Sequence, residues 1–321
     1  MFVGITNTPR DYAWGSRTAI AELFGYPPPG AREAELWLGT HPGSPARLTA
    51  GSGTLAELTT LPFLLKVLAA QTPLSLQAHP TTAQAIAGFD RENAAGIPLD
   101  APSRNYKDAS HKPELIFALQ DGFRALCGFR PVEQTRAVLS RLGSVASPLL
   151  DRLPDDSALS SAFEWLISGG PAVSSLVSAV SAGAASVPGI EFEAVSVLAA
   201  AYPGDPGIVI SLLLNVVELR RGEVLYLPAG NIHAYLNGLG VELMAASDNV
   251  LRGGLTPKHV DVPELLRVLD FSPVAVPYLE PTSGGPGVSV YRPDVPDFEL
   301  VHVFGDDLDV QLELPGAAIA L

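Results

Sequence analysis

The sequence predicts a mostly β fold, a sandwich of sheets interrupted by an α-helical insertion. Three changes in texture along the 321 residues support this prediction. Residues 1 to about 125 alternate short strand-like runs with Gly/Pro-rich turns, and residues 130 to 202 have helical periodicity. Residues 207 to 255 then return to continuous apolar runs separated by turns. We therefore expect two strand-rich regions that pack together around a helical block.

Short apolar runs bounded by turn residues predict the individual strands. In the first region they are LPFLLKVL (61–68), PLSLQAH (73–79) and PELIFAL (113–119), and the second region reads as strands from Gly207 onward. Helices are predicted in PVEQTRAVLSRLGS (131–144), DDSALSSAFEWLIS (155–168) and EFEAVSVLAAAYP (191–203). The last fifty residues contain two more strand-like stretches, GVSVYRPDVPDFELVHVF (287–304) and DLDVQLELPGAAIAL (307–321).

These elements predict three parts of the chain. The expected division is a discontinuous main domain at 1–129 and 204–272, a helical insertion at 130–203, and a C-terminal β lobe at 273–321.

The composition argues against several classes of protein. A single cysteine, Cys127, excludes an internal disulfide framework and a thiolate zinc site, so any metal needs nitrogen and oxygen ligands. The N-terminus lacks the pattern of a signal peptide, and the longest uncharged stretch, residues 166–190, is interrupted by Pro171 and Pro188. The net charge of −14 disfavours nucleic acid. We expect a cytoplasmic monomer that binds neither nucleic acid nor membranes.

Four residues from three stretches are candidate metal ligands. In PLSLQAHPTT, Gln77 and His79 are two residues apart, and residues i and i+2 of a strand project from the same face. Glu114 opens the strand after Lys-Pro, and a Pro-x-Gly turn leads directly into His233. Each residue alone also fits a structural role. Together they supply an amide oxygen, a carboxylate and two imidazoles, which suit a divalent ion such as zinc.

Further polar residues follow His233 in the chain. Glu242, Asp248, Arg252 and Lys258 fall within seventeen residues and are candidates for an acid, a base and an anion binder. Among the remaining histidines, His111 precedes Lys112 and is a candidate neighbour of the site. We expect the others to be structural: His41, His259 and His302.

Seven stretches, in the same order, resemble the type I phosphomannose isomerases. They are YAWGS, ELWLGTHPGSPA, LPFLLKVL, PLSLQAHP, DASHKPELIFAL, GEVLYLPAGNIHAYL and ASDNVLRGGLTPKHVD. The resemblance implies a zinc-dependent aldose–ketose isomerase that interconverts mannose 6-phosphate and fructose 6-phosphate through an enediol(ate). It also implies cupin jelly-roll sandwiches with a helical insertion. The main domain is then the catalytic cupin-like domain, and the C-terminal lobe is an incomplete or reduced second cupin.

The resemblance also assigns roles to residues. Gln77, His79, Glu114 and His233 match the family's ligands for one zinc ion per chain, and Arg252 matches its active-site arginine. The proton-transferring base stays open among Lys112, Asp248 and Glu242, with Lys112 or Asp248 preferred. The residues expected to bind the phosphosugar are Ser75, Lys258, Lys66 and Trp14.

The sequence leaves two alternative functions open. A metal-dependent cupin oxygenase would use the same fold, but the amide ligand Gln77 counts against it. A non-catalytic phosphosugar-binding cupin would keep the pocket, but Lys112, Glu114, Asp248 and Arg252 argue against lost chemistry.

Overall fold

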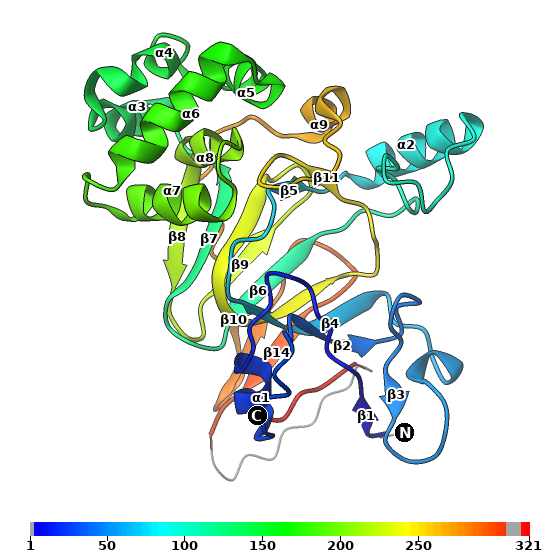
Figure 1. The fold of residues 1–321 in the computed structure, drawn as a ribbon. Helices are drawn as coiled ribbons and strands as arrows, with labels where there is room; N and C mark the ends of the chain where they lie inside the picture. Colours follow the sequence, from blue (N-terminus) through cyan, green and yellow to red (C-terminus); the bar gives the residue numbers. More distant parts are fainter. Residues whose placement is uncertain (1–2, 306–315) are drawn as a thin grey trace.

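The computed structural model describes residues 3–305 and 316–321, and one long strand organises it (Figure 1). Strand β10 (His233–Ala245) belongs to two antiparallel sheets at once. Its first half pairs with β7 (Phe123–Phe129) and β5 (Gln77–Ala78), and its second half pairs with β4 (Phe63–Ala70) and β6 (Glu114–Ala118). Apolar side chains from both sheets form a common core between them.

Outer strands extend both sheets. The nine strands are connected through β10. Their pairings give the order β2-β4-β10-β6-β9 in one sheet and β8-β7-β10-β5-β11 in the other. The added strands are β2 (Glu35–Gly39), β8 (Leu214–Leu219), β9 (Val224–Leu227) and β11 (Leu251–Arg252). Two smaller sheets consist of β1 (Ile5–Thr6) with β3 (Arg47–Leu48), and of β12 (Thr282–Gly285), β13 (Val288–Tyr291) and β14 (Leu300–Val303).

An irregularity in β10 decides which of its residues face the interior. The register with β7 slips by one residue between Tyr235 and Asn237, and Gly238 follows with a φ of 132°. On an uninterrupted strand His233 and Glu242, nine residues apart, would point to opposite faces. The extra residue at the bulge changes the alternation. Both side chains are consequently buried between the sheets.

Helices cover the outer face of the sheet that contains β5 and β7. Between β7 and β8 lie α3 (Val132–Ser140), α4 (Ser147–Leu150), α5 (Leu159–Ser168), α6 (Pro171–Ala184), α7 (Ile190–Ala201) and α8 (Gly207–Ile210). The 3₁₀ turns of this block are η2 (Gly143–Ala146), η3 (Asp156–Ala158) and η4 (Ser211–Leu213). Elsewhere the chain forms α1 (Ala19–Phe24), η1 (Leu55–Glu57), α2 (Thr82–Ala94) and α9 (Val262–Val268).

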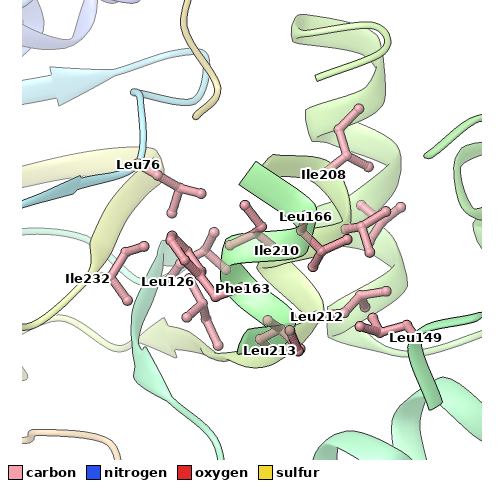
Figure 2. Close-up of a cluster of buried hydrophobic side chains, with 14 of the residues drawn as sticks. Leu76, Leu126, Leu149, Phe163, Leu166, Ile208, Ile210, Leu212, Leu213 and Ile232 are labelled. Atoms are coloured by element: carbon pink, nitrogen blue, oxygen red, sulfur yellow. The ribbon is translucent and has the colours of Figure 1, made fainter. Parts of the chain in front are cut away.

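The largest hydrophobic core lies between these helices and the sheet. Figure 2 shows Leu76, Leu126 and Ile232 of the sheet region beside Phe163 and Leu166 of α5. Strand neighbours point the other way, since Cys127 and Tyr235 belong to the core between the two sheets. The helices therefore bury one face of this sheet, and its other face is turned toward the interior.

The structure corrects two parts of the predicted fold. Helix accounts for 30% of the structure and strand for 24%, so "mostly β" describes only the two central sheets. The run that begins at Gly207 was predicted as a strand, but it is helical through Leu213. Its helix starts where Asp205 Oδ1 accepts a hydrogen bond from the Gly207 N–H (2.7 Å). All seven residues are buried, which removes the periodicity that distinguishes helix from strand.

The first of the two strand-like C-terminal stretches, residues 287–304, contains β13 and β14. The DLDVQLEL part of the second stretch lies outside the described residues, and residues 316–321 form no strand. In the part of the chain that the structure describes, no single helix is long and apolar enough to cross a membrane. Residues Asp156–Ser168 and Pro171–Ala184 meet those criteria only as a pair bent by 94°.

Replacing Gly238 by alanine should lower the free energy of unfolding by about 3 kcal/mol. An added Cβ would lie 2.8 Å from Phe123 Cα, and the positive φ disfavours any L side chain. Gly51 also has a positive φ, but a Cβ there meets nothing within 4 Å, so Gly51→Ala should cost only about 1 kcal/mol. Urea denaturation followed by circular dichroism measures both, and equal losses would contradict the close contact at the bulge.

Candidate metal centre

Three buried ligating side chains meet between the two sheets. His79, Glu114 and His233 each place a nitrogen or oxygen within 4.8 Å of the others. The carboxylate oxygens of Glu114 lie 3.3 Å from Nε2 of His79 and 3.3 Å from Nε2 of His233. At most 1% of any of these residues is exposed. Glu114 is the first residue of β6 and His233 the first of β10, so distant parts of the sequence converge here.

Backbone carbonyls fix the orientation of both imidazole rings. His79 Nδ1 lies 2.7 Å from the carbonyl oxygen of Asn249, and His233 Nδ1 lies 3.0 Å from that of Asn231. Because a carbonyl only accepts hydrogen bonds, each Nδ1 carries the proton and each Nε2 turns its lone pair toward Glu114. Burial lowers the pKa of His79 to about 4, although the Glu114 carboxylate opposes this. The His79 ring is therefore neutral at pH 7.

The arrangement fits a divalent metal ion. Nε2 of His79, Nε2 of His233 and Oε2 of Glu114 are buried and have no hydrogen-bond partner. Leaving buried polar atoms unpartnered is costly, whereas zinc accepts imidazole nitrogen and carboxylate oxygen as ligands. The donor set thus matches the nitrogen and oxygen ligands that the sequence predicted.

Gln77 lies opposite His233 in the sheet. It was predicted to lie near the metal because of its i, i+2 spacing from His79, which is not the reason that the structure gives. The expected strand at 73–79 pairs only at Gln77–Ala78, and His79 lies beyond it, so the i, i+2 argument does not apply. Pro80 lacks the N–H that would extend the ladder. The register instead places Gln77 opposite His233 on one side and opposite Arg252 on the other. Opposed residues share a face, so these three side chains start from one face of the sheet.

Lys112 lies directly against Glu114. Its Nζ is 2.8 Å from Glu114 Oε1, and only 9% of its side chain is exposed. Burial raises the pKa of Glu114, but the adjacent Lys112 ammonium group opposes burial and holds this pKa well below its usual range. The carboxylate therefore stays ionised at neutral pH, as a metal ligand must.

A second group of buried charges adjoins the first. Lys66 Nζ lies 2.8 Å from Glu242 Oε2 and 3.7 Å from Glu35 Oε1, and none of the three residues is more than 7% exposed. Burial lowers the pKa of Lys66, but Glu242, Glu35 and Glu114 together raise it above its ordinary value. Burial raises the pKa of Glu242, and Lys66 opposes that rise. The charge of Lys66, a predicted substrate-binding residue, is thus already balanced by carboxylates.

His41 contacts one of the candidate site residues, Asp248. Its Nε2 lies 3.4 Å from Asp248 Oδ2, and its Nδ1 accepts a hydrogen bond from the Gly43 N–H at 3.1 Å. The ring meets Trp37 edge-on and is buried, whereas the Asp248 side chain is 55% exposed. The expectation that His41 is structural stays a prediction, but the sequence did not predict its contact with the candidate base Asp248. The available signal was the position of His41 in a stretch that resembles the family.

The other predicted residues lie in varied surroundings. Arg252 is half-buried, makes no ion pair within the described residues, and has its pKa lowered by burial. Lys258 is exposed, while Ser75 and Trp14 are half-buried. His111 Nε2 lies 2.9 Å from Asp297 Oδ2, which ties the segment before Lys112 to the C-terminal region.

Comparison with known proteins gives consistent matches. A family model described as "Phosphomannose isomerase type I, catalytic domain" matches residues 2–60 and 50–132. The mannose-6-phosphate isomerase of Salmonella typhimurium is 41% identical over 293 residues, which cover 84% of this chain and 75% of that protein. The Homo sapiens mannose-6-phosphate isomerase is 35% identical over 346 residues, which cover 91% of this chain and 79% of that protein.

A solved structure is also similar over most of the chain. The crystal structure of mannose 6-phosphate isomerase from Salmonella typhimurium, bound to its substrate fructose 6-phosphate and to zinc, superposes with a TM-score of 0.85. The two chains are 38% identical, and the match covers 93% of this chain and 82% of that one.

Replacing Lys66 by methionine should destabilise the protein by roughly 3 kcal/mol or more at pH 7, because two carboxylates would stay buried without their counter-charge. The pKa of Glu242 is already raised, and removing Lys66 raises it further. A carboxyl group with a higher pKa in the folded than in the unfolded protein stabilises the fold increasingly as the pH falls. The deficit relative to the parent protein should therefore shrink from pH 7 toward the ordinary glutamate value of 4.5.

Urea denaturation across that pH range checks this prediction. The double variant Lys66→Met/Glu242→Gln should recover much of the lost stability, because it removes both members of the closer ion pair. A deficit that does not change with pH, or a double variant less stable than Lys66→Met, would contradict the assignment.

Proposed function

The chain belongs to the type I phosphomannose isomerase family, and we infer from this that it is a zinc-dependent aldose–ketose isomerase interconverting mannose 6-phosphate and fructose 6-phosphate. The main structural support for this function is the buried cluster of His79, Glu114 and His233, whose ligating atoms lie within 4.8 Å of one another. The chain spans three quarters or more of these relatives' length. His79 and Glu114 lie within residues 2–132, which the family model matches.

We propose that the two sheets sharing β10 form the family's cupin-like sandwich and that β12–β14 belong to a reduced second cupin. The antiparallel pairing and the metal ligands between the sheets support the first assignment. We propose a catalytic domain at 1–129 and 204–272, a helical insertion at 130–203 and a C-terminal lobe at 273–321. The helices α3–α7, which lie between Val132 and Ala201, support the insertion.

We propose that His79, Glu114, His233 and Gln77 hold one zinc ion. Gln77 would be a neutral oxygen ligand, which its register opposite His233 supports. With one anionic ligand the ion keeps a net positive charge and supplies Lewis acidity toward substrate oxygens. Asn249 and Asn231 accept from the Nδ1–H groups and so orient both rings.

Isomerisation moves a proton between the two carbons that exchange the carbonyl, and negative charge develops on their oxygens. We propose that Arg252 stabilises that charge, because Arg252 lies opposite Gln77 in the sheet register and its guanidinium has no ion-pair partner in the described chain. Lys112 and Asp248 remain the proposed proton-transferring groups. We assign Glu242 to holding Lys66, since their 2.8 Å contact is buried.

We also propose that the partner is a small phosphosugar, that the protein is a cytoplasmic monomer, and that it binds neither nucleic acid nor membranes. The net charge of −14 supports the exclusion of polyanions. For the phosphosugar we propose contacts from Ser75, Trp14, Lys66 and Lys258. Of these, only Lys66 lies among the buried charges of the site.

A coupled assay tests the function. Purified protein should convert mannose 6-phosphate to fructose 6-phosphate, contain one zinc per chain, lose turnover on chelation and regain it with zinc. Oxygen consumption without isomerisation would indicate the oxygenase alternative. Saturable binding of the phosphosugar without turnover would indicate a non-catalytic cupin, and either result would contradict the proposal.

Replacing Arg252 by alanine should keep one zinc per chain while kcat/KM falls by roughly two decades, about 3 kcal/mol of lost transition-state stabilisation. Arg252→Lys should recover only part of the loss, because an ammonium group cannot form the bidentate fork of a guanidinium. Zinc analysis and steady-state kinetics measure both. A variant with normal kcat and only a raised KM would make Arg252 a uniform substrate binder instead.

A further inference from the structure

We propose that the side chain of Asn249 is a positioning residue for the metal centre, because it holds its own backbone carbonyl in place at His79 Nδ1. This proposal rests on the zinc site of the proposed function. The carbonyl oxygen of Asn249 lies 2.7 Å from His79 Nδ1. His79 is fully buried, and its Nε2 has no hydrogen-bond partner. The ring therefore depends on this single contact for the direction of its ligating lone pair.

The acceptor lies in a segment without regular secondary structure. Residues 246–250 connect the end of β10 at Ala245 to β11 at Leu251, and none of them pairs in a sheet. The backbone of this segment therefore needs other contacts to hold a carbonyl at a fixed place. The Asn249 side chain supplies them, and it is completely buried.

The amide group of Asn249 is saturated by one loop, residues 107–110. Its Oδ1 accepts from the N–H of Lys107 (2.7 Å) and from the N–H of Asp108 (3.2 Å). Its Nδ2 donates to the carbonyl of Asp108 (2.9 Å), to the carbonyl of Ser110 (2.8 Å) and to Asp108 Oδ1 (3.1 Å). Only an amide offers two acceptor sites and two donors in this geometry. An aspartate of the same shape would turn an oxygen toward three acceptors.

Asp108, in the loop of residues 107–110, also binds the segment of residues 246–250. Its Oδ1 accepts from the Ser247 hydroxyl (2.8 Å) and the Ser110 N–H (2.9 Å), and its Oδ2 accepts from the Asp248 N–H (3.0 Å). Asp108 thus contacts Ser247 and Asn249, which lie about 140 residues further along the sequence. Both sides of the loop–segment contact are thus fixed by side chains.

The two segments that meet here lead directly into other residues of the site. The loop continues into Lys112 and Glu114, while the segment continues into Arg252. His233, in contrast, takes its Nδ1 acceptor from Asn231, two residues away in its own chain segment. His79 relies on a partner 170 residues away. We therefore infer that loss of the Asn249 amide disturbs the His79 side of the centre first.

The test compares Asn249→Asp with a matched control, Asn215→Asp. Asn215 is also buried, and its Nδ2 also donates to three carbonyls, those of Cys127, Gly128 and Val274. Both variants should lose stability. Zinc affinity, measured by competition with a chromophoric chelator, should fall by roughly 10- to 100-fold in Asn249→Asp and change less than about threefold in Asn215→Asp. The ligand-field spectrum of the cobalt-substituted protein should change only in Asn249→Asp.

A milder variant keeps the test informative if Asn249→Asp does not fold. Ser247→Ala removes a hydroxyl that donates to Asp108 Oδ1 and to the Ser110 carbonyl and accepts from the Asn249 backbone N–H. It leaves the Asn249 side-chain amide in place, so it should weaken zinc binding by a smaller factor in the same direction. Parental zinc affinity and an unchanged cobalt spectrum in Asn249→Asp, or in Ser247→Ala where only that variant folds, would overturn the inference alone. A parent protein that binds no zinc would overturn the proposed metal centre as well.

Discussion

The bulge in β10 is the constraint on which the site depends. This strand belongs to both sheets, and a slip of one residue between Tyr235 and Asn237 changes which side chains face the interior. His233 can then enter the interior from one sheet and Glu242 from the other, although their spacing of nine residues would separate them on a regular strand. The metal ligand and the buried charge cluster therefore share one interior because of a backbone irregularity.

The buried charges make the interior receptive to a cation. Two ammonium groups, Lys66 and Lys112, face three carboxylates, those of Glu35, Glu114 and Glu242, and all five residues are buried. The formal sum is one negative charge, which a divalent ion converts to one positive charge. A phosphosugar that develops further negative charge during isomerisation would then meet a net positive interior. The excess buried carboxylate therefore lies where a bound divalent ion would balance its charge.

The sequence predicted the metal ligands better than the contacts that hold them. Glu114 at the start of β6 and His233 after a Pro-x-Gly turn follow from local patterns, and both are in the buried group. The helix at Gly207–Leu213 was missed because an entirely buried run has no periodicity to read. The contact of the Asn249 carbonyl with His79 and the contact of His41 with Asp248 join residues that are far apart in the sequence. No local pattern encodes such partners.

The helical block explains how the sheet that contains β5 and β7 can carry polar and ligating side chains on its inner face. Leu76, Leu126 and Ile232 project outward from the sheet into the core that α5 and its neighbours form, so the apolar burial needed for stability lies behind the site. The inner face can then hold ions and unpartnered lone pairs, which stabilise the fold less. Because the match to the zinc-bound relative covers 93% of the chain, most of these helices must lie within the shared fold. A layer that only has to supply apolar volume tolerates extensive substitution, which explains why the insertion lacks recognisable motifs while the strands in front of it retain theirs.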